Sequence, residues 1–122
     1  MREYFVVFVV AAAVTFLTTP LVRALAVVTG ADAEARADAA GIVLNKNAIP
    51  FDPQKPNIAS GIRVGTPCVT TQGMGTDEMV TVAELIATAV TKGDADPEHP
   101  VSTQVRAEVS DLVTRFPAYP RP

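Results

Sequence analysis

The chain has 122 residues and a formal net charge of -3 at pH 7, with 10 Lys and Arg against 13 Asp and Glu. That length allows one modest domain, and the scattered basic residues form no patch of the kind that binds nucleic acid. A single cysteine, Cys68, and a single histidine, His99, exclude an internal disulfide and a cysteine–histidine metal cluster. We expect Cys68 to be a small buried residue and His99 to be solvated.

The first thirty residues predict an apolar leader. Residues 4–22 contain no charged side chain, and after Arg23 a mostly apolar stretch continues to residue 28. This run is long enough to cross a bilayer, so we expect a transmembrane helix within residues 1–30, with membrane contact through residues 4–28. A cleaved signal peptide is the alternative, and a buried soluble helix is the third possibility.

The segment after the leader predicts a short helix and a small sheet. Residues 32–40 are rich in alanine, with acidic residues early and a glycine directly after them, which is typical of a helix with a glycine stop. The apolar run at residues 41–45 and the segment at residues 58–64 have strand length and composition. We therefore expect two or three short strands.

Residues 45–73 form a segment punctuated by proline. Asp52, Lys55 and Thr66 each precede a proline, which pushes their backbone out of the helical region. This stretch is therefore predicted to run as loop and strand.

Arg63 stands alone in that segment, between Ile62 and Val64 and with a glycine on each side of the triplet. Glycines in a strand let another group approach the backbone closely. A planar guanidinium suits a carboxylate held by two parallel hydrogen bonds, so we interpret Arg63 as a candidate anion-binding residue. The alternative is an edge-strand arginine whose side chain lies in solvent.

The last third of the chain predicts two amphipathic helices. Residues 76–92 begin with a threonine cap and acidic residues and carry apolar side chains at helical spacing, and residues 102–116 repeat that spacing after a polar linker. We expect both helices to cover one face of the sheet, which gives an α+β domain at residues 31–122.

Three sequence blocks, NKNAIPFDP, SGIRVGTP and TTQGMG, follow one another between residues 45 and 75. In these blocks the chain resembles the C-terminal domain of serine hydroxymethyltransferase, a pyridoxal-phosphate enzyme that interconverts serine and glycine with tetrahydrofolate. The resemblance extends over roughly residues 32–119. It implies the α+β C-terminal domain of the fold-type I pyridoxal-phosphate enzymes, a cytoplasmic location for this domain and a place in one-carbon metabolism.

The resemblance implies roles for five residues. Arg63 would bind the α-carboxylate of serine or glycine. Asn47 would lie near the pterin of the folate, and Lys55, Pro56 and Asn57 would lie in the folate-contacting loop. Asn57 departs from the family, which usually has an apolar residue at this position.

The same resemblance implies that the chemistry needs parts outside this chain. The family uses a Schiff-base lysine for pyridoxal phosphate, and Lys46, Lys55 and Lys92 do not stand in its sequence context. The other cofactor contacts belong to the large domain of the family, on which this layer packs. Without that partner an apolar face would stay exposed, which favours self-association or binding of a homologous subunit. We therefore assign no catalytic and no metal-binding residue, and we expect the chain to be inactive alone.

The leader resembles a different family. Residues 1–31 look like the first membrane helix of the bacterial polyprenyl-phosphate sugar-1-phosphate transferases, which often combine an apolar run with a Thr-Pro-Leu-Val-Arg turn. None of the acidic loops of those enzymes follows, so no catalytic residue is transferred from them. A join between two such pieces suggests a fused or truncated reading frame.

Two hypotheses of function follow. The first is a fragment of a serine hydroxymethyltransferase that carries the substrate-carboxylate arginine and depends on missing elements for its cofactor. The second is a membrane-anchored interaction or structural protein in which the site is vestigial.

Overall fold

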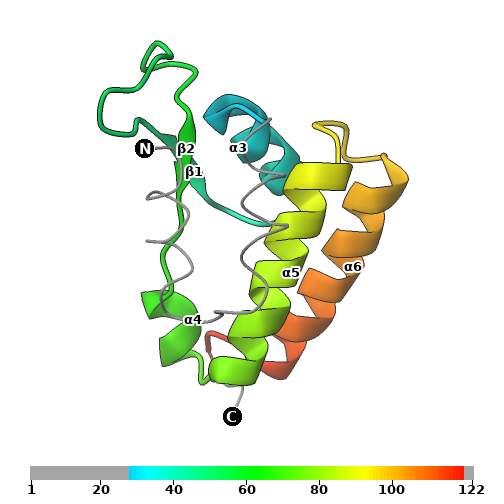
Figure 1. Ribbon diagram of the computed structural model, residues 1–122. Helices are drawn as coiled ribbons and strands as arrows, with labels where there is room; N and C mark the ends of the chain where they lie inside the picture. Colours follow the sequence, from blue (N-terminus) through cyan, green and yellow to red (C-terminus); the bar gives the residue numbers. More distant parts are fainter. Residues whose placement is uncertain (1–27, 120–122) are drawn as a thin grey trace.

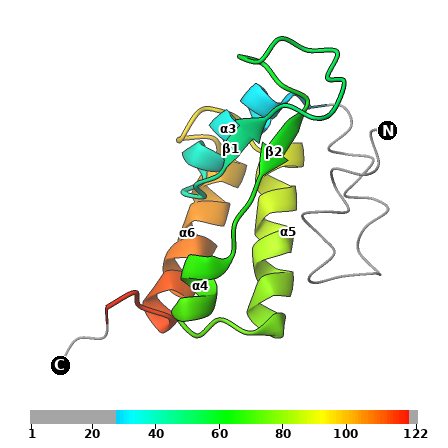
Figure 2. The same cartoon turned by 90° about the vertical axis from the view of Figure 1, so that its left-hand side faces the viewer.

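The computed structural model describes residues 28–119, which form an α+β layer of four helices and two short strands. In chain order these are α3 (Gly30–Ala39), β1 (Asn45–Asn47), β2 (Gly61–Arg63), α4 (Pro67–Thr71), α5 (Thr76–Lys92) and α6 (Pro100–Arg115). The longest helices, α5 and α6, run side by side (Figure 1). The strands and α3 lie at one end of this pair and α4 lies at the other, as Figure 2 also shows. The predicted α+β class is confirmed.

Helix α3 begins two residues earlier than the sequence pattern indicates. Thr29 caps it, because its Oγ1 accepts a hydrogen bond of 3.1 Å from the backbone N–H of Asp32. At the other end Gly41 adopts a φ of 78°, and the N–H groups of Gly41 and Ile42 donate to the carbonyls of Asp38 and Ala37. This pair of bonds is a Schellman ending, which requires a left-handed residue at the position of Gly41.

The sheet is a single antiparallel pair, in which Asn45 lies opposite Arg63 and Asn47 lies opposite Gly61. The strand predicted at residues 41–45 is displaced: β1 starts at Asn45 and consists of polar residues. The physical reason is the helix ending, because Ile42 is used to close α3 and cannot begin a strand.

The core consists of two apolar clusters that share α5. One joins Ala33, Ile62, Ile86 and Val90, and the other joins Ala40, Leu85, Ala89 and Val105. On α5, Ile86 and Val90 therefore face α3 and the sheet, whereas Leu85 and Ala89 face α6 and the end of α3. The apolar stripes of both helices form core, as expected, but α6 packs against α5 and α3 instead of covering the sheet.

Three local expectations are corrected. Cys68 is exposed, because it lies on α4, a five-residue helix without buried residues that the sequence pattern did not predict. His99 is half-buried and caps α6, since its Nδ1 accepts a 3.3 Å hydrogen bond from the N–H of Val101. Helix α5 has its expected bounds, but its N-cap is Gly75 instead of a threonine, and the N–H of Gly75 donates to Oε2 of Glu78 at 2.8 Å.

The predicted membrane helix lies almost entirely in residues 1–27, which are outside the described part of the chain. The predicted boundary at residue 30 falls at the start of α3. Within residues 28–119, no helix combines the length and the apolar character needed to span a bilayer.

Gly30 marks the closest approach between α3 and the hairpin. Its N–H donates to the carbonyl of Ala59 at 3.0 Å, and a Cβ placed there would lie far inside contact distance of the Gly61 carbonyl oxygen. We expect Gly30→Ala to lower the free energy of unfolding by about 1–3 kcal/mol, because neither backbone can move aside cheaply. Urea unfolding followed by far-ultraviolet circular dichroism measures this change.

Gly65→Ala is the matched control. A Cβ at Gly65 would meet its nearest neighbour, Pro67 Cδ, at an ordinary 3.7 Å. Equal unfolding midpoints for the two variants would contradict the close approach at Gly30.

Candidate functional site

The outer face of the hairpin gathers the polar residues that the sequence singles out. Successive side chains of a strand point to opposite faces, so Asn45 and Asn47 share one face of β1. Arg63, directly opposite Asn45, lies on that same face and is exposed, whereas Ile62 points into the core. Gly61, opposite Asn47, is buried and contributes no side chain to this face.

Arg63 is exposed but partnered. Its Nε donates a 3.2 Å hydrogen bond to Oδ1 of Asn45, whose Nδ2 donates to the carbonyl of Lys46 at 2.8 Å. Among residues 28–119, neither terminal nitrogen of the guanidinium has a hydrogen bond or an ion pair. The side-chain amide of Asn45 therefore binds the Nε–H of Arg63 and leaves the two terminal nitrogens of the guanidinium to bind a ligand. The sequence reasoning missed Asn45, although a hairpin register would have placed it beside Arg63.

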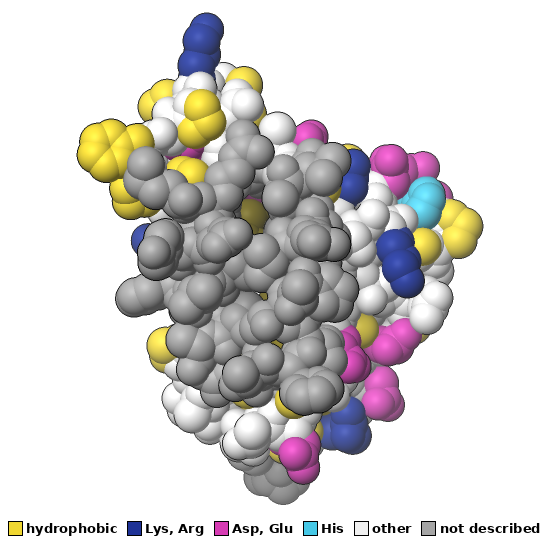
Figure 3. Space-filling model, viewed as in Figure 1, with side chains coloured by type: hydrophobic (Ala, Val, Ile, Leu, Met, Phe, Trp, Pro, Cys, Tyr) yellow, Lys and Arg dark blue, Asp and Glu magenta, His cyan; other side chains and the backbone are white. Residues whose placement is uncertain are grey.

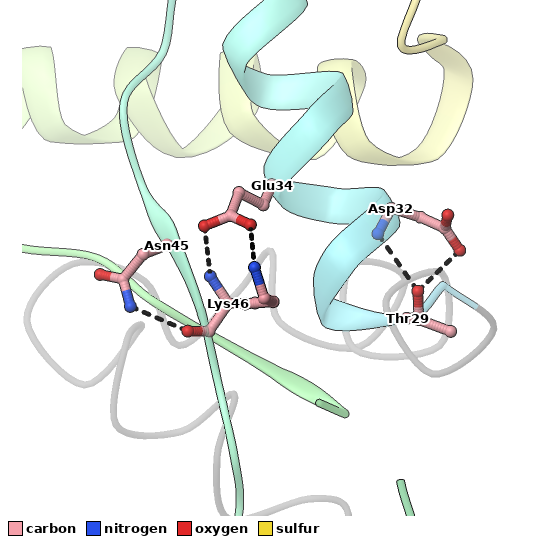
Figure 4. Close-up of polar contacts among 5 residues, drawn as sticks. All are labelled: Thr29, Asp32, Glu34, Asn45 and Lys46. Carbon is pink, nitrogen blue, oxygen red and sulfur yellow. Dashed lines mark hydrogen bonds and ion pairs between the residues drawn. The ribbon is translucent and has the colours of Figure 1, made fainter. Parts of the chain in front are cut away.

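Lys46 points away from this face and fastens β1 to α3. Its Nζ lies 2.8 Å from Oε2 of Glu34, and its backbone N–H donates to Oε1 of the same carboxylate at 3.2 Å (Figure 4). The side-chain hydrogen bond from Lys46, followed by the backbone one, holds the pKa of Glu34 below its usual range. The carboxylate of Glu34 thus accepts hydrogen bonds from both the ammonium and the backbone N–H of Lys46.

The folate-loop candidates lie on the connection between the strands. Lys55, Pro56 and Asn57 are all exposed near the end of the long loop at residues 48–60, which extends beyond the strands in Figure 1. Asn47 is half-buried and its Nδ2 donates to the carbonyl of Ala48 at 2.9 Å. Within the described residues, no hydrogen bond joins these side chains to Arg63. All five candidates lie on one hairpin, and in the described part of the chain no hydrogen bond joins their side chains to one another.

Asp52 organises that loop, a role that the sequence reasoning did not assign. Its Oδ1 accepts from the Ser60 hydroxyl at 2.6 Å and from the Gln54 N–H at 2.9 Å. Its Oδ2 accepts from the N–H groups of Ser60 and Ile49 at 2.9 and 3.1 Å. The hydroxyl of Ser60, helped by these backbone donors and opposed by partial desolvation, lowers the pKa of Asp52 to about 2.

The surface of the loop is largely apolar. Phe51 is 90% exposed, and the flanking residues Pro50, Pro53 and Pro56 are exposed as well. Figure 3 shows hydrophobic side chains gathered at the end of the molecule that this loop forms, with a basic side chain projecting beyond them. The loop therefore presents a mixed apolar and cationic surface. This surface lies next to the arginine face, which is the face of the hairpin that carries Asn45, Asn47 and Arg63.

Residues 21–86 match the Serine hydroxymethyltransferase family, which is more than half of the chain and includes the whole hairpin. The chain belongs to the serine hydroxymethyltransferase family. This finding confirms the family resemblance read from the sequence blocks. The match begins inside the predicted leader, and the likeness of residues 1–31 to a membrane transferase stays a prediction.

Two curated relatives illustrate the similarity. The chain is 48% identical over 93 residues to serine hydroxymethyltransferase of Paramagnetospirillum magneticum (strain ATCC 700264 / AMB-1), covering 75% of this chain and 22% of the relative. It is 52% identical over 93 residues to the enzyme of the same name from Desulforapulum autotrophicum (strain ATCC 43914 / DSM 3382 / VKM B-1955 / HRM2), covering 75% of this chain and 21% of the relative. The chain spans about a fifth of the length of these relatives.

The attachment of β1 to α3 is expected to depend on pH in the acid range. Because the pKa of Glu34 is lowered in the folded state, its contribution is present above the ordinary carboxyl pKa of about 4.3 and is lost as the pH falls through the folded value. Hydrogen exchange at the Lys46 amide should therefore lose protection on acidification beyond its intrinsic pH dependence. Glu34→Ala should remove this dependence, as observed by NMR.

Glu84→Ala is the control, because Glu84 is an exposed residue of α5 with no side-chain hydrogen bond among the described residues. Identical exchange at Lys46 in the Glu34 variant and the parent chain would show that the contact does not hold the strand.

Proposed function

We propose that this chain is the C-terminal module of a serine hydroxymethyltransferase and that Arg63 binds the α-carboxylate of serine or glycine. The observation that supports this role is the hydrogen bond from its Nε to Asn45, which leaves the two terminal nitrogens without a hydrogen-bond partner among residues 28–119. A carboxylate accepts two parallel hydrogen bonds from the planar fork of a guanidinium. The reaction in question converts serine and tetrahydrofolate to glycine and methylene-tetrahydrofolate.

Arg63 has a positioning role in this proposal. A guanidinium stays protonated at all accessible pH values, so it serves neither as acid nor as base. By fixing the carboxylate it restricts rotation of the bound amino acid and so orients the bond that is to break. The attachment of the hairpin to α3 through Lys46 and Glu34 supports this role, because a loosely held cation would orient its ligand poorly.

The loop at residues 48–60 is proposed to face tetrahydrofolate. Asn47 at its start would lie near the pterin, and Lys55, Pro56 and Asn57 would contact the folate farther along. Support comes from the connectivity: the loop leaves β1 next to Asn47 and returns into the strand that carries Arg63. Its exposed apolar and cationic side chains suit a flat heteroaromatic ring with an anionic tail.

Pyridoxal phosphate, which supplies the electron sink for this chemistry, does not fit the lysines of this chain. The Lys46 ammonium is paired with Glu34, and Lys55 and Lys92 are exposed. A Schiff-base lysine needs a partly desolvated, enclosed amine. We therefore infer that the cofactor belongs to a large-domain subunit, and that this chain acts only with such a partner.

A membrane-anchored interaction or structural protein with a vestigial site is the second candidate. The uncharged run at residues 4–22 favours it. In that case the anchor lies within residues 1–30, whose last two residues also cap and begin α3, and residues 31–122 form the rest of the folded domain. Both this boundary and the membrane contact of residues 4–28 belong to the proposal.

Reconstitution tests the first candidate. We expect the full chain, produced together with the part of the Paramagnetospirillum magneticum enzyme that it does not cover, to restore serine cleavage that depends on tetrahydrofolate. Glycine should then enhance the absorbance of bound pyridoxal phosphate. Arg63→Ala should raise the KM for serine on the order of 30-fold or more, since a charged ligand group loses its partner.

Arg115→Ala is the matched control, because Arg115 is an exposed arginine at the end of α6 that pairs with Asp111. It should leave the KM for serine unchanged. A serine KM in the Arg63 variant equal to that of the parent would refute the assigned role. Absence of any cofactor band in the parent complex would remove the enzyme hypothesis itself.

Alkaline carbonate extraction of membranes from expressing cells tests the second candidate. An integral segment at residues 4–28 should keep the full chain in the pellet, because carbonate strips only peripheral proteins. A variant that starts at residue 28 should be released. Recovery of the full chain in the supernatant would rule out the anchor.

A further inference from the structure

The loop at residues 48–60 is fixed at both of its ends by one side chain. Asp52 lies on the outgoing leg, and its Oδ2 bridges the N–H of Ile49 on that leg and the N–H of Ser60 on the return leg. Its Oδ1 binds the Ser60 hydroxyl and the Gln54 N–H. Every one of these donors belongs to the loop itself, so the carboxylate acts within the loop and not on a neighbouring element.

The return leg is docked separately on α3. The carbonyls of Ile58 and Ala59 accept from the N–H groups of Ala31 and Gly30 at 2.9 and 3.0 Å. The side chain of Ala59 is completely buried. The return leg is therefore the fixed part, and the outgoing leg depends on Asp52 for its attachment to it.

Two residues of the loop adopt a backbone conformation that non-glycine residues rarely take. Phe51 and Ala59 both have a φ of 55°. For a bulky residue such as Phe51 this conformation is unfavourable, and it persists only where the surroundings determine it. Phe51 directly precedes Asp52 and its own side chain is 90% exposed, so packing of that side chain does not hold it there. The turn bond from the backbone N–H of Asp52 to the carbonyl of Ile49, at 3.1 Å, and the side-chain hydrogen bonds of Asp52 are the described interactions on either side of Phe51 that hold it.

We propose that Asp52 is the positioning residue of this loop: by joining Ile49 to Ser60 it fixes where Lys55, Pro56 and Asn57 stand relative to Arg63. The link to Arg63 is short, because Ser60 directly precedes β2. We call the hydrogen bonds from Ile49, Gln54 and Ser60 to Asp52 the clamp. The consequence for tetrahydrofolate binding rests on the function proposed above, whereas the clamp itself does not. Asp52 takes no part as acid or base, because both of its oxygens are occupied by loop donors.

Amide exchange in the full chain, measured by NMR, tests the clamp. In Asp52→Ala the amides of Ile49, Gln54 and Ser60 should exchange about tenfold faster or more, since each loses its acceptor. Asp52→Asn keeps one acceptor oxygen and should give a smaller increase. Ser60→Ala should increase exchange at the Ile49 and Gln54 amides less than Asp52→Ala does, because the carboxylate remains.

Asp38→Asn is the matched control for the loss of a negative charge. Asp38 is exposed on α3 and its side chain makes no hydrogen bond among the described residues. In the Asp38→Asn variant the amides of Ile49, Gln54 and Ser60 should exchange as in the parent chain. Unchanged exchange at all three loop amides in both Asp52 variants would overturn the proposal.

The reconstituted enzyme tests the consequence for the ligand. Asp52→Ala should raise the KM for tetrahydrofolate about tenfold and leave the KM for serine within about twofold, whereas Arg63→Ala should do the reverse. A fall in kcat alone, with both KM values unchanged, would show a merely structural role and would overturn the positioning claim. If Asp52→Ala does not fold, Asp52→Asn provides the same comparison. If the parent complex shows no activity, the proposed function fails, and the exchange measurement still decides on the clamp.

Discussion

The fastening of the hairpin to the first turns of α3 is the constraint on which the candidate site depends. Two backbone hydrogen bonds from Gly30 and Ala31 hold the return leg of the loop, and Glu34 holds β1 through both the ammonium and the amide of Lys46. A two-stranded hairpin is at best marginally stable by itself. Its attachment to a helix that is itself part of the core holds the backbone beneath Arg63 in place, and Asn45 on the same face then orients the guanidinium.

Much of this fold follows from local sequence signals. The spacing of apolar residues in α5 gives its bounds directly, because its buried residues recur with the helical period. The position of β1 does not follow in that way. Its three residues are all polar, and its place is fixed by the ending of α3 at Gly41 and by the carboxylate of Glu34, which are contacts between elements. Apolar composition alone therefore places the strand too early.

In the candidate site, too, some residues are recognisable from local sequence and others only from contacts between segments. Arg63 stands out in the sequence because a charged residue between β-branched neighbours and glycines is unusual. Its partner Asn45 and the clamp residue Asp52 do not stand out, since asparagine and aspartate are ordinary loop residues. Their roles depend on the register that sets Asn45 opposite Arg63 and on the fold of the loop that brings Ser60 back to Asp52. Register and loop closure are long-range properties, which a local pattern does not contain.

The exposure of Cys68 has a practical consequence for any study of assembly. It is the single thiol of the sequence and lies open on α4, at the end of the helical pair away from the hairpin. Oxidation in air would link two chains through one defined bridge and imitate a dimer on a sizing column. Kept reduced, the same thiol accepts a maleimide dye at a known place remote from Arg63, which gives a fluorescent reporter of binding that leaves the arginine face untouched.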